Sequence, residues 1–595
     1  MFPWHEALCA MLFASPELPW PTQVRAWRSL ESLPDEIVTQ LLRHPRLSVH
    51  ERLASTPHAW QTRVARATTR TVSDQVECTI TPECQPVWKV LASLSELQSV
   101  KLASPGIRFA PFSSVHPVFR LLTSLPNLRK LALPGGDMGR LGTEMDSFAI
   151  GLAELFAALP LLECLDLQDT AVPVSAVKHL GEGLATLQHL TSLNISKCLI
   201  QFVHHQGTIS PVSDLIKGLA LHIVRLRSLR SLVTQSTGLP GPPAATDISE
   251  ALAPVLPGMP CLENFEVMGH TFGDAGAGSI ARALRGCTHL RALTLVGSGL
   301  TCGSGLAECL KATTMLSKFC WLDDNPMNDG FADLTASICA LPGLVDLEIS
   351  LVGFDSVATF ARHFAASSLA TSLSVLGFCG KALGNDAVAQ LGPALASCPQ
   401  LRSLQFALES SRDPMQLCPH LARLTTLTNF AIVNENAQTL AALLPSLSSL
   451  ESVGLGGGSL TAAGFTSVCD RLSTLSKLTS LEVADVFEAG GGPAVAAALS
   501  LFTGLCKLTL CCHGLEASDV SALGPVIGSM APLTHLQLKI PQNALAGVAA
   551  LAENLTSLSQ LQVLDVTDGV SRNSDAGQAL LRTLHRCQNV DFRFM

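Results

Sequence analysis

One hydrophobic pattern recurs along most of the chain and predicts its architecture. The stretch from Leu290 to Leu316 shows the pattern most clearly. Leu290, Leu293 and Leu295 follow an L-x-x-L-x-L spacing typical of a strand with one buried face. A glycine-rich turn follows, and then Leu306, Cys309 and Leu310 stand at helical spacing. Such a short strand–turn–helix unit cannot bury its own apolar face, so it requires stacked copies of itself.

The copies are present and hold a regular register. The first leucine of each L-x-x-[LIVF]-x-[LIVFW] core serves as a mark, and only the Leu229 core departs from the pattern, with Thr234 in its last place. The mean interval is 29 residues, and seven intervals equal 28. The pattern therefore predicts an α/β solenoid with one continuous core. The seventeen marks are Leu97, Leu128, Leu162, Leu190, Leu229, Leu262, Leu290, Leu316, Leu344, Leu373, Leu401, Leu427, Leu450, Leu478, Leu505, Leu533 and Leu561.

This pattern resembles the leucine-rich repeat, whose period is roughly 20–29 residues. The long period and the helical segment 273–284 resemble the ribonuclease-inhibitor-like subclass. The resemblance covers residues from about 90 to the C-terminus. It implies a horseshoe of parallel strands on the concave side and α-helices on the convex side. The family's turn usually carries Asn or Cys three positions after the strand, whereas this chain varies there, with Thr170, Cys198, Ser298, Asp324, His513, Gly136 and Gly458.

The ends and the irregular repeats set the expected domain organisation. Residues 76–595 form the array of about 17 repeats, with a starting strand at 76–80 and a last partial strand around Val590 and Phe592. The units that begin at Leu128, Leu190 and Leu229 are long, and the third contains the Pro- and Gly-rich stretch 238–247. Such composition predicts a loop, and loops on one rim of a solenoid often carry recognition.

Residues 1–75 do not repeat and predict an N-terminal helical segment. Within it, residues 33–60 resemble an F-box, which begins L-P-x-E-[IL] and carries a tryptophan about 27 residues later. The resemblance implies that these residues hold the adaptor subunit of a cullin-type ubiquitin ligase. The alternative is a helical cap that shields the first repeat. The matching residues are Leu33, Pro34, Ile37, Leu41, Leu42 and Trp60.

Composition narrows the environment and the partner. The formal net charge of −9 argues against nucleic acid as the main partner, because phosphate binding needs clustered Lys and Arg. The 19 cysteines form no C-x-x-C pair, which favours reduced thiols and a cytoplasmic or nuclear location. No apolar run reaches about 18 residues, and Glu6 interrupts the N-terminal apolar stretch, so we expect neither a membrane span nor a signal peptide.

Candidate catalytic and metal motifs have structural interpretations. The glycines at Gly297 and Gly299 recur at equivalent places in other repeats, as turn residues do. The pair His204-His205 lacks further metal ligands at fixed spacing. The run 511–513 (Cys-Cys-His) directly follows a strand and lacks an orienting group. We therefore expect no enzymatic activity, no metal and no cofactor.

The outward residues of the predicted strands form the candidate binding surface, because side chains alternate across a strand. We expect a polar face, acidic in its middle, that contacts a protein partner. The sharper hypothesis is substrate recognition for a cullin-type ligase. The alternative is a scaffold or regulator resembling ribonuclease-inhibitor-type or GTPase-activating leucine-rich-repeat proteins. The candidate residues are Glu263, Glu266, Arg291, Lys318, Asp323, Asp346, Glu348, Arg402, Gln405, Glu482, Lys507 and His535.

Overall fold

A computed structural model describes most of the repeat array. The F-box-like residues 33–60 and the rest of the N-terminal segment before Gln75 lie outside the described residues. The described residues are 75–79, 98–103, 119–120, 122–133, 145–168, 170–201, 209–210, 212–236, 248–270, 273–323, 329–351, 354–379, 385–407, 418–433, 444, 447–456, 461–484, 489–511, 513–568, 580 and 591–594.

The chain divides into two compact units, Met1–Pro242 and Pro243–Met595. In the first unit, short strands pair in parallel in the order β1-β2-β3-β4-β6-β9, and a small second sheet pairs β5 with β7 and β7 with β8. The bounds are β1 Gln75–Thr79, β2 Ser99–Ala103, β3 Lys130–Ala132, α7 Met145–Ala158, β4 Cys164–Asp166, β5 Ala171–Pro173, α8 Val174–Leu184, β6 Ser192–Asn194, β7 Leu199–Gln201, β8 Ile209–Ser210, α9 Val212–Ile223 and β9 Ser231–Gln235.

The second unit is more regular, and each strand from β10 to β22 pairs in parallel with the next one along the chain. Its strands are β10 Asn264–Met268, β11 Ala292–Val296, β12 Lys318–Leu322, β13 Asp346–Ser350, β14 Val375–Cys379, β15 Ser403–Ala407, β16 Asn429–Val433, β17 Ser452–Gly456, β18 Ser480–Ala484, β19 Lys507–Cys511, β20 His535–Ile540, β21 Val563–Asp568 and β22 Asp591–Phe594.

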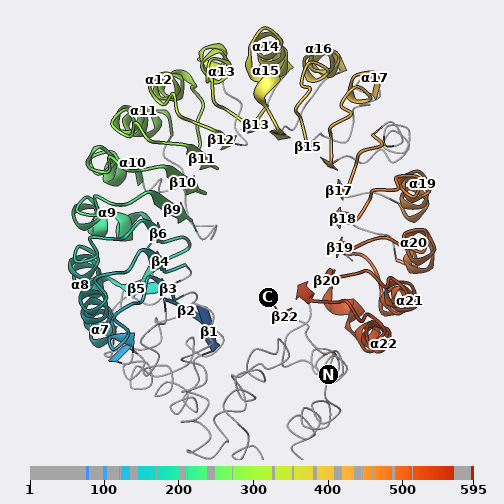
Figure 1. The fold of residues 1–595 in the computed structure, drawn as a ribbon, viewed down its shortest axis with the longest axis horizontal. Helices are drawn as coiled ribbons and strands as arrows, with labels where there is room; N and C mark the ends of the chain where they lie inside the picture. Colours follow the sequence, from blue (N-terminus) through green and yellow to red (C-terminus); the bar gives the residue numbers. More distant parts are fainter. Residues whose placement is uncertain are drawn as a thin grey trace, which may run out of the picture. The chain divides into compact units, whose positions relative to one another are not determined.

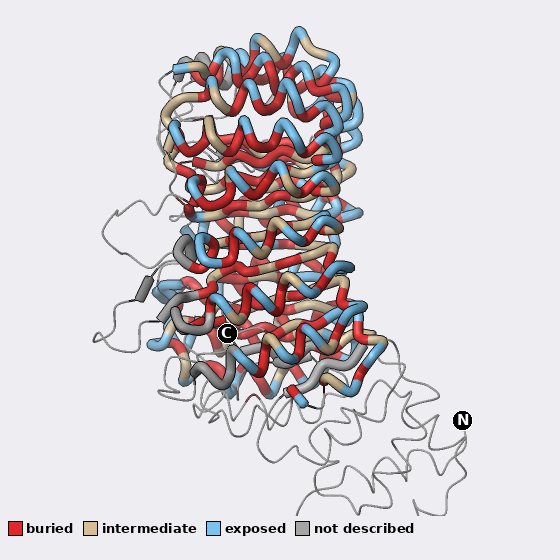
Figure 2. The backbone as a smooth tube through the Cα atoms, turned by 90° about the vertical axis from the view of Figure 1, so that its left-hand side faces the viewer, coloured by how far each residue is buried: buried red, intermediate tan, exposed pale blue. Residues whose placement is uncertain are grey.

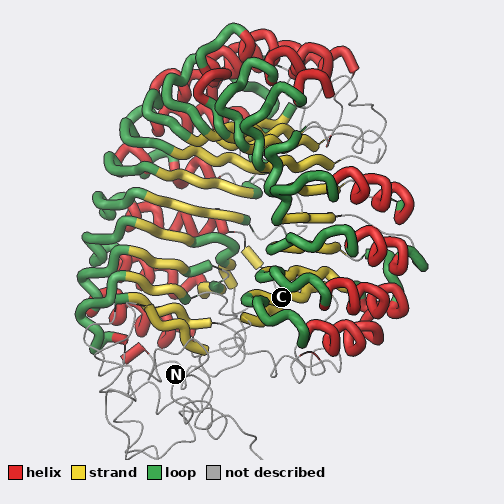
Figure 3. The backbone as a smooth tube through the Cα atoms, turned by 45° about the vertical axis from the view of Figure 1, so that its right-hand side comes forward, coloured by secondary structure: helices red, strands yellow, loops and turns green. Residues whose placement is uncertain are grey.

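Helices alternate with these strands and lie along the outer side of the curved ladder that the second unit forms, opposite the inner strand face (Figures 1 and 3). The helical bounds are α10 Ile248–Leu252, η5 Leu256–Gly258, α11 Gly273–Leu284, α12 Ser304–Ala312, α13 Phe331–Cys339, α14 Phe354–Ala365, α15 Leu369–Ser372, α16 Asn385–Leu395, α17 Cys418–Leu421, α19 Ala462–Leu472, α20 Gly492–Leu499, α21 Ala517–Gly528, η8 Gln542–Gly547 and α22 Val548–Leu555.

The leucines of the repeated pattern form the core between the strand layer and the helix layer. Leu290 and Leu293 are fully buried, and Leu295 retains only 2% exposure. Figure 2 shows buried positions recurring along the strands and helices of successive repeats. Larger side chains fill the same layer in some repeats, as where the rings of Phe360 and Phe378 meet edge to face with centroids 5.5 Å apart. The α/β solenoid predicted from the leucine spacing is confirmed.

Both ends of the strand ladder and the helix positions match the sequence prediction closely. The starting strand predicted at 76–80 is β1, and the partial strand around Val590 and Phe592 is β22. Segment 273–284 forms α11, and Leu306, Cys309 and Leu310 lie buried in α12. The long Leu190 unit accommodates β7 and β8, which explains its extra length in part.

The residue before each strand from β11 to β21 forms a second ladder that the leucine pattern does not reveal. Its backbone N–H and that of the following residue both donate to one carbonyl of the preceding repeat, as when Arg291 and Ala292 donate to Glu263. In alternate repeats of the second unit the residue is Ser or Thr, and its hydroxyl donates to the same carbonyl at 2.9–3.3 Å. These hydroxyls belong to Ser317, Ser374, Thr428, Thr479 and Thr534.

The residues that replace the family's usual Asn still connect neighbouring repeats. The hydroxyl of Thr170 donates to the Leu133 carbonyl, and the thiol of Cys198 donates to the Leu167 carbonyl, both at 3.0 Å. Ser298 donates to the carboxylate of Asp323, also at 3.0 Å. Thus Thr, Cys and Ser each bind the adjacent turn. Asp324, Gly136 and Gly458 lie outside the described residues.

Candidate protein-binding face

The strand register of the second unit arranges the outward side chains into columns that run across the sheet, and two of these columns contain the candidate residues. The first column contains Asn264, Ala292, Lys318, Asp346, Val375, Ser403, Asn429, Ser452, Ser480, Lys507, His535 and Val563. The second contains Glu266, Thr294, Cys320, Glu348, Gly377, Gln405, Ala431, Gly454, Glu482, Thr509, Gln537 and Asp565. We call these columns, on β10 to β21, the concave face.

Most of the candidate residues lie on this concave face. They are Glu266, Lys318, Asp346, Glu348, Gln405, Glu482, Lys507 and His535. Glu263, Arg291 and Arg402 instead precede their strands by one residue. Two residues separate consecutive leucines in the pattern, and only the second of them, such as Ala292 after Arg291, lies within the strand.

The prediction that Asp323 contacts a partner is wrong. Its side chain is 6% exposed, and one carboxylate oxygen accepts hydrogen bonds from the Ser298 hydroxyl and the Leu300 N–H, both at 3.0 Å. Asp323 therefore holds the preceding turn. Thr294 faces outward as its register predicts, but it is only 7% exposed, and it stands between Glu266 and Cys320 of the neighbouring strands.

Acidic side chains gather at the β10–β13 end of the concave face. The Lys318 ammonium lies 3.2 Å from Oδ2 of Asp346, and the Cys320 thiol donates to Oε2 of Glu348 at 3.4 Å. The amide of Asn264 donates to Oε1 of Glu266 at 2.9 Å. Burial lowers the pKa of Lys318, but the nearby carboxylates of Asp346 and Glu348 outweigh it and leave that pKa raised. Lys318 is the single basic residue in the two columns over these four strands.

The middle of the face, on β14 to β17, has a floor of small and uncharged residues. Its second column reads Gly377, Gln405, Ala431 and Gly454. A Cβ on Gly377 would lie 3.0 Å from Cγ of Glu348, and one on Gly454 would lie 3.1 Å from Cβ of Ala431. The side chain of Glu348 thus leans over the glycine of the next strand. The leucine pattern does not single out this floor, although Gly and Ala stand at equivalent positions in three repeats of the sequence.

The β18–β21 end carries charges of both signs. Glu482 and Lys507 are exposed, and His535 is half-buried with its Nδ1 2.9 Å from the Thr534 hydroxyl. The amide nitrogen of Gln537 donates to Asp565 at 3.3 Å. The opposite ends of the concave face therefore differ, since the β10–β13 end is mainly acidic and the β18–β21 end is mixed.

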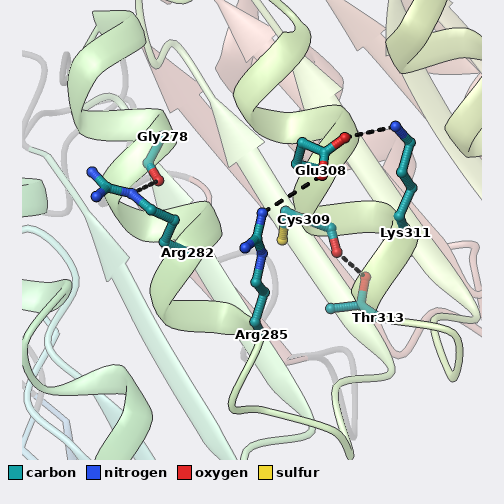
Figure 4. A network of polar contacts seen from close by, with 7 residues as sticks. All are labelled: Gly278, Arg282, Arg285, Glu308, Cys309, Lys311 and Thr313. Carbon is teal, nitrogen blue, oxygen red and sulfur yellow. Dashed lines mark hydrogen bonds and ion pairs between the residues drawn. The ribbon is translucent and has the colours of Figure 1, made fainter.

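The convex helices have their own polar network, drawn in Figure 4. Glu308 on α12 accepts from Lys311 at 2.6 Å and lies 3.6 Å from the guanidinium of Arg285, which follows α11. The hydrogen bond and charge of Lys311 lower the pKa of Glu308. Because these groups are exposed, the pairs contribute little stability, and the same surface offers a control for experiments on the concave face.

The glycine and cysteine motifs have structural roles in the described part of the chain. Gly297 and Gly299 adopt positive φ values of 64° and 72°, which a tight turn requires and glycine tolerates. Cys511 is buried, while His513 is exposed in the next turn; the pair His204-His205 lies outside the described residues. Among the described residues, no group of three or more His, Cys, Asp or Glu could hold a metal ion.

Twelve cysteines whose side chains the structure describes are free thiols. Burial raises the pKa of Cys287 to about 11 and that of Cys398 to about 12. A thiol with so high a pKa remains protonated at neutral pH and reacts slowly. These residues act as small apolar side chains in the core.

Comparison with known proteins adds little to this description. Neither a protein-family profile nor a curated protein matches the sequence. Among solved structures, the internalin InlF from Listeria monocytogenes str. 4b F2365 shares 15% identity over 74% of this chain and 89% of its own, with a TM-score of 0.25. The TLR13–ssRNA13 complex shares 13% identity over 84% of this chain and 81% of its own, with a TM-score of 0.31.

The fold assignment therefore rests on the geometry of the chain itself. Parallel strands in register, a leucine core and alternating outer helices define a leucine-rich-repeat solenoid. In the portion of the chain that the structure covers, no helix combines the length and the apolar character needed to cross a bilayer.

Proposed function

We propose that this chain is a non-catalytic protein-binding protein that uses the concave face of its second unit to hold a protein partner. The supporting observation is the pair of outward columns on β10 to β21, a continuous set of side chains held in register by a rigid parallel ladder. A sheet that is buried on one face only keeps its other face for solvent or a partner.

Site-specific photo-crosslinking tests this proposal. A benzoylphenylalanine at exposed Gln405 on the concave face should crosslink a cellular protein as a discrete adduct. The same probe at exposed Glu308 on the convex helix α12 is the matched control. Equal adducts at both positions, or none at Gln405, would contradict concave-face binding.

In its finer form, the proposal makes the chain a substrate-recognition subunit of a cullin-type ubiquitin ligase. The F-box-like residues at 33–60, with Leu33, Pro34, Ile37, Leu41, Leu42 and Trp60, support this form. They would bind the adaptor subunit while the repeats bind the target. A reducing compartment, the cytoplasm or the nucleus, fits the free thiols.

Binding of the full chain to a purified adaptor subunit separates this form from a scaffold or regulator. Pro34→Ala combined with Ile37→Ala should abolish adaptor binding and leave the melting temperature unchanged. Gln40→Ala is the control within the same segment. If the double substitution lowers the melting temperature and the wild-type chain binds no adaptor, residues 33–60 are a cap and the scaffold function replaces the ligase function.

A further inference from the structure

The β13 strand places two carboxylates on the concave face with few cations to balance them. Asp346 and Glu348 are two residues apart, so both side chains point outward with their Cβ atoms about 7 Å apart. The outward columns over β10 to β13 contain three carboxylates, those of Glu266, Asp346 and Glu348, and one amine, that of Lys318. This end of the face thus favours a cation.

The existing partners leave the carboxylate pair incompletely satisfied. Lys318 binds only Oδ2 of Asp346, while Oδ1 of Asp346 is buried and has no hydrogen-bond partner among the described residues. The Cys320 thiol, a weak donor, binds one oxygen of Glu348. Both side chains are nevertheless partly exposed, so a group that brings several N–H donors can reach the remaining oxygens of the pair.

The neighbouring strands allow a chain segment to approach closely. Next to Glu348 lies Gly377, and the outward residues from β14 to β17 carry no charge. Parallel strands are about 4.8 Å apart, so this floor extends about 19 Å beyond β13. That distance matches roughly six residues of extended chain or thirteen residues of helix.

We propose that the concave face holds a partner segment carrying arginine or lysine, with its cationic side chain on the Asp346–Glu348 pair and its backbone over the β14–β17 floor. This inference rests on the proposed function and names the chemistry of the partner. A guanidinium has five donors in a planar fork and can reach both carboxylates, so arginine fits better than lysine. An apolar segment would bury both carboxylates with Lys318 as their single counter-charge in the two columns of β10 to β13, which is costly.

Fluorescence anisotropy with the full chain provides the test. The probe is a fluorescein-labelled decapeptide of alternating arginine and alanine, and its counterpart replaces arginine with glutamate. The arginine peptide should bind, and Asp346→Asn with Glu348→Gln should weaken it about tenfold, the scale of two partly exposed ion pairs. Glu308→Gln with Asp470→Asn, exposed acids on helices α12 and α19, removes the same total charge and should change binding less than twofold.

Three outcomes would overturn the inference. These are no binding of the arginine peptide, equal weakening by both double substitutions, and equal binding of the glutamate peptide. Circular dichroism and melting curves check that each variant folds. If a crosslinked partner binds the Asp346→Asn, Glu348→Gln chain as well as wild type, this inference fails while the proposed function stands; if Gln405 gives no adduct at all, the proposed function fails first.

Discussion

The two faces of the β10–β21 sheet are built from the same strands but obey different rules. The side that packs against the helices repeats leucine and other large apolar residues, and Leu293, Leu347 and Leu404 are all fully buried. The concave face has no such repetition, since equivalent positions hold Glu348, Gly377 and Gln405. The side that packs against the helices must fit similar neighbouring repeats at close packing, whereas the concave face has no partner within the repeat array. The fold therefore constrains one face and leaves the other to recognition.

The largest expected effect tests the difference between the faces directly. Leu293→Ala removes a fully buried side chain and should lower the free energy of unfolding by about 2–5 kcal/mol. Arg291→Ala, two residues earlier and exposed, should change it by less than about 0.5 kcal/mol. Urea unfolding followed by circular dichroism measures both. Similar losses at the two positions would refute the assignment of Leu293 to the buried core and of Arg291 to the surface.

A buried histidine in the turn after β10, His270, adds a pH dependence to stability. His270 is 5% exposed, and burial lowers its pKa to about 4. Below pH 6.5 the unfolded chain binds a proton that the folded chain does not, so stability falls as the pH drops from about 6.5 to 4. The full loss is roughly 3 kcal/mol.

His270→Gln should flatten the stability profile between pH 7 and pH 4.5, whereas His289→Gln, at an exposed position, should leave the slope unchanged. Urea unfolding at a series of pH values measures the slope. An unchanged slope in His270→Gln would show that other groups cause the acid sensitivity.

The turns between strand and helix depend on buried carboxylates rather than leucines. Asp519 is 1% exposed and accepts from the N–H groups of Gly490, Gly492 and Glu516 at 2.9–3.0 Å. Asp519→Asn loses the charge and leaves a single acceptor oxygen, so unfolding should become easier by about 1–3 kcal/mol. Asp470→Asn, at an exposed position of α19, is the control in urea unfolding, and equal effects would contradict the role of Asp519.

The hydroxyl ladder gives the smallest expected effect. Thr428→Val keeps the side-chain shape but removes the 3.2 Å hydrogen bond to the Arg402 carbonyl. That carbonyl keeps its two backbone donors, so the loss should be about 0.5–1.5 kcal/mol. Urea unfolding measures this loss, and Thr425→Val, at an exposed position, should cost less in the same experiment. A larger loss at Thr425 would contradict a stabilising ladder.

The sequence alone determined the repeat, the strands and the core, because leucine spacing is a local property of each unit. It predicted the positions of α11, α12, β1 and β22. Of the twelve candidate partner-binding residues, eight lie on the concave face.

Only the tertiary structure decided which outward residues are accessible. Asp323 is buried by its bonds to the turn of the preceding repeat, 23 to 25 residues earlier, and Thr294 is screened by its neighbours in register. Arg291 precedes its strand, and its backbone N–H donates to the carbonyl of Glu263 in the preceding repeat. These features arise from contacts between repeats, and the pattern within one repeat carries no information about what its neighbour places beside it.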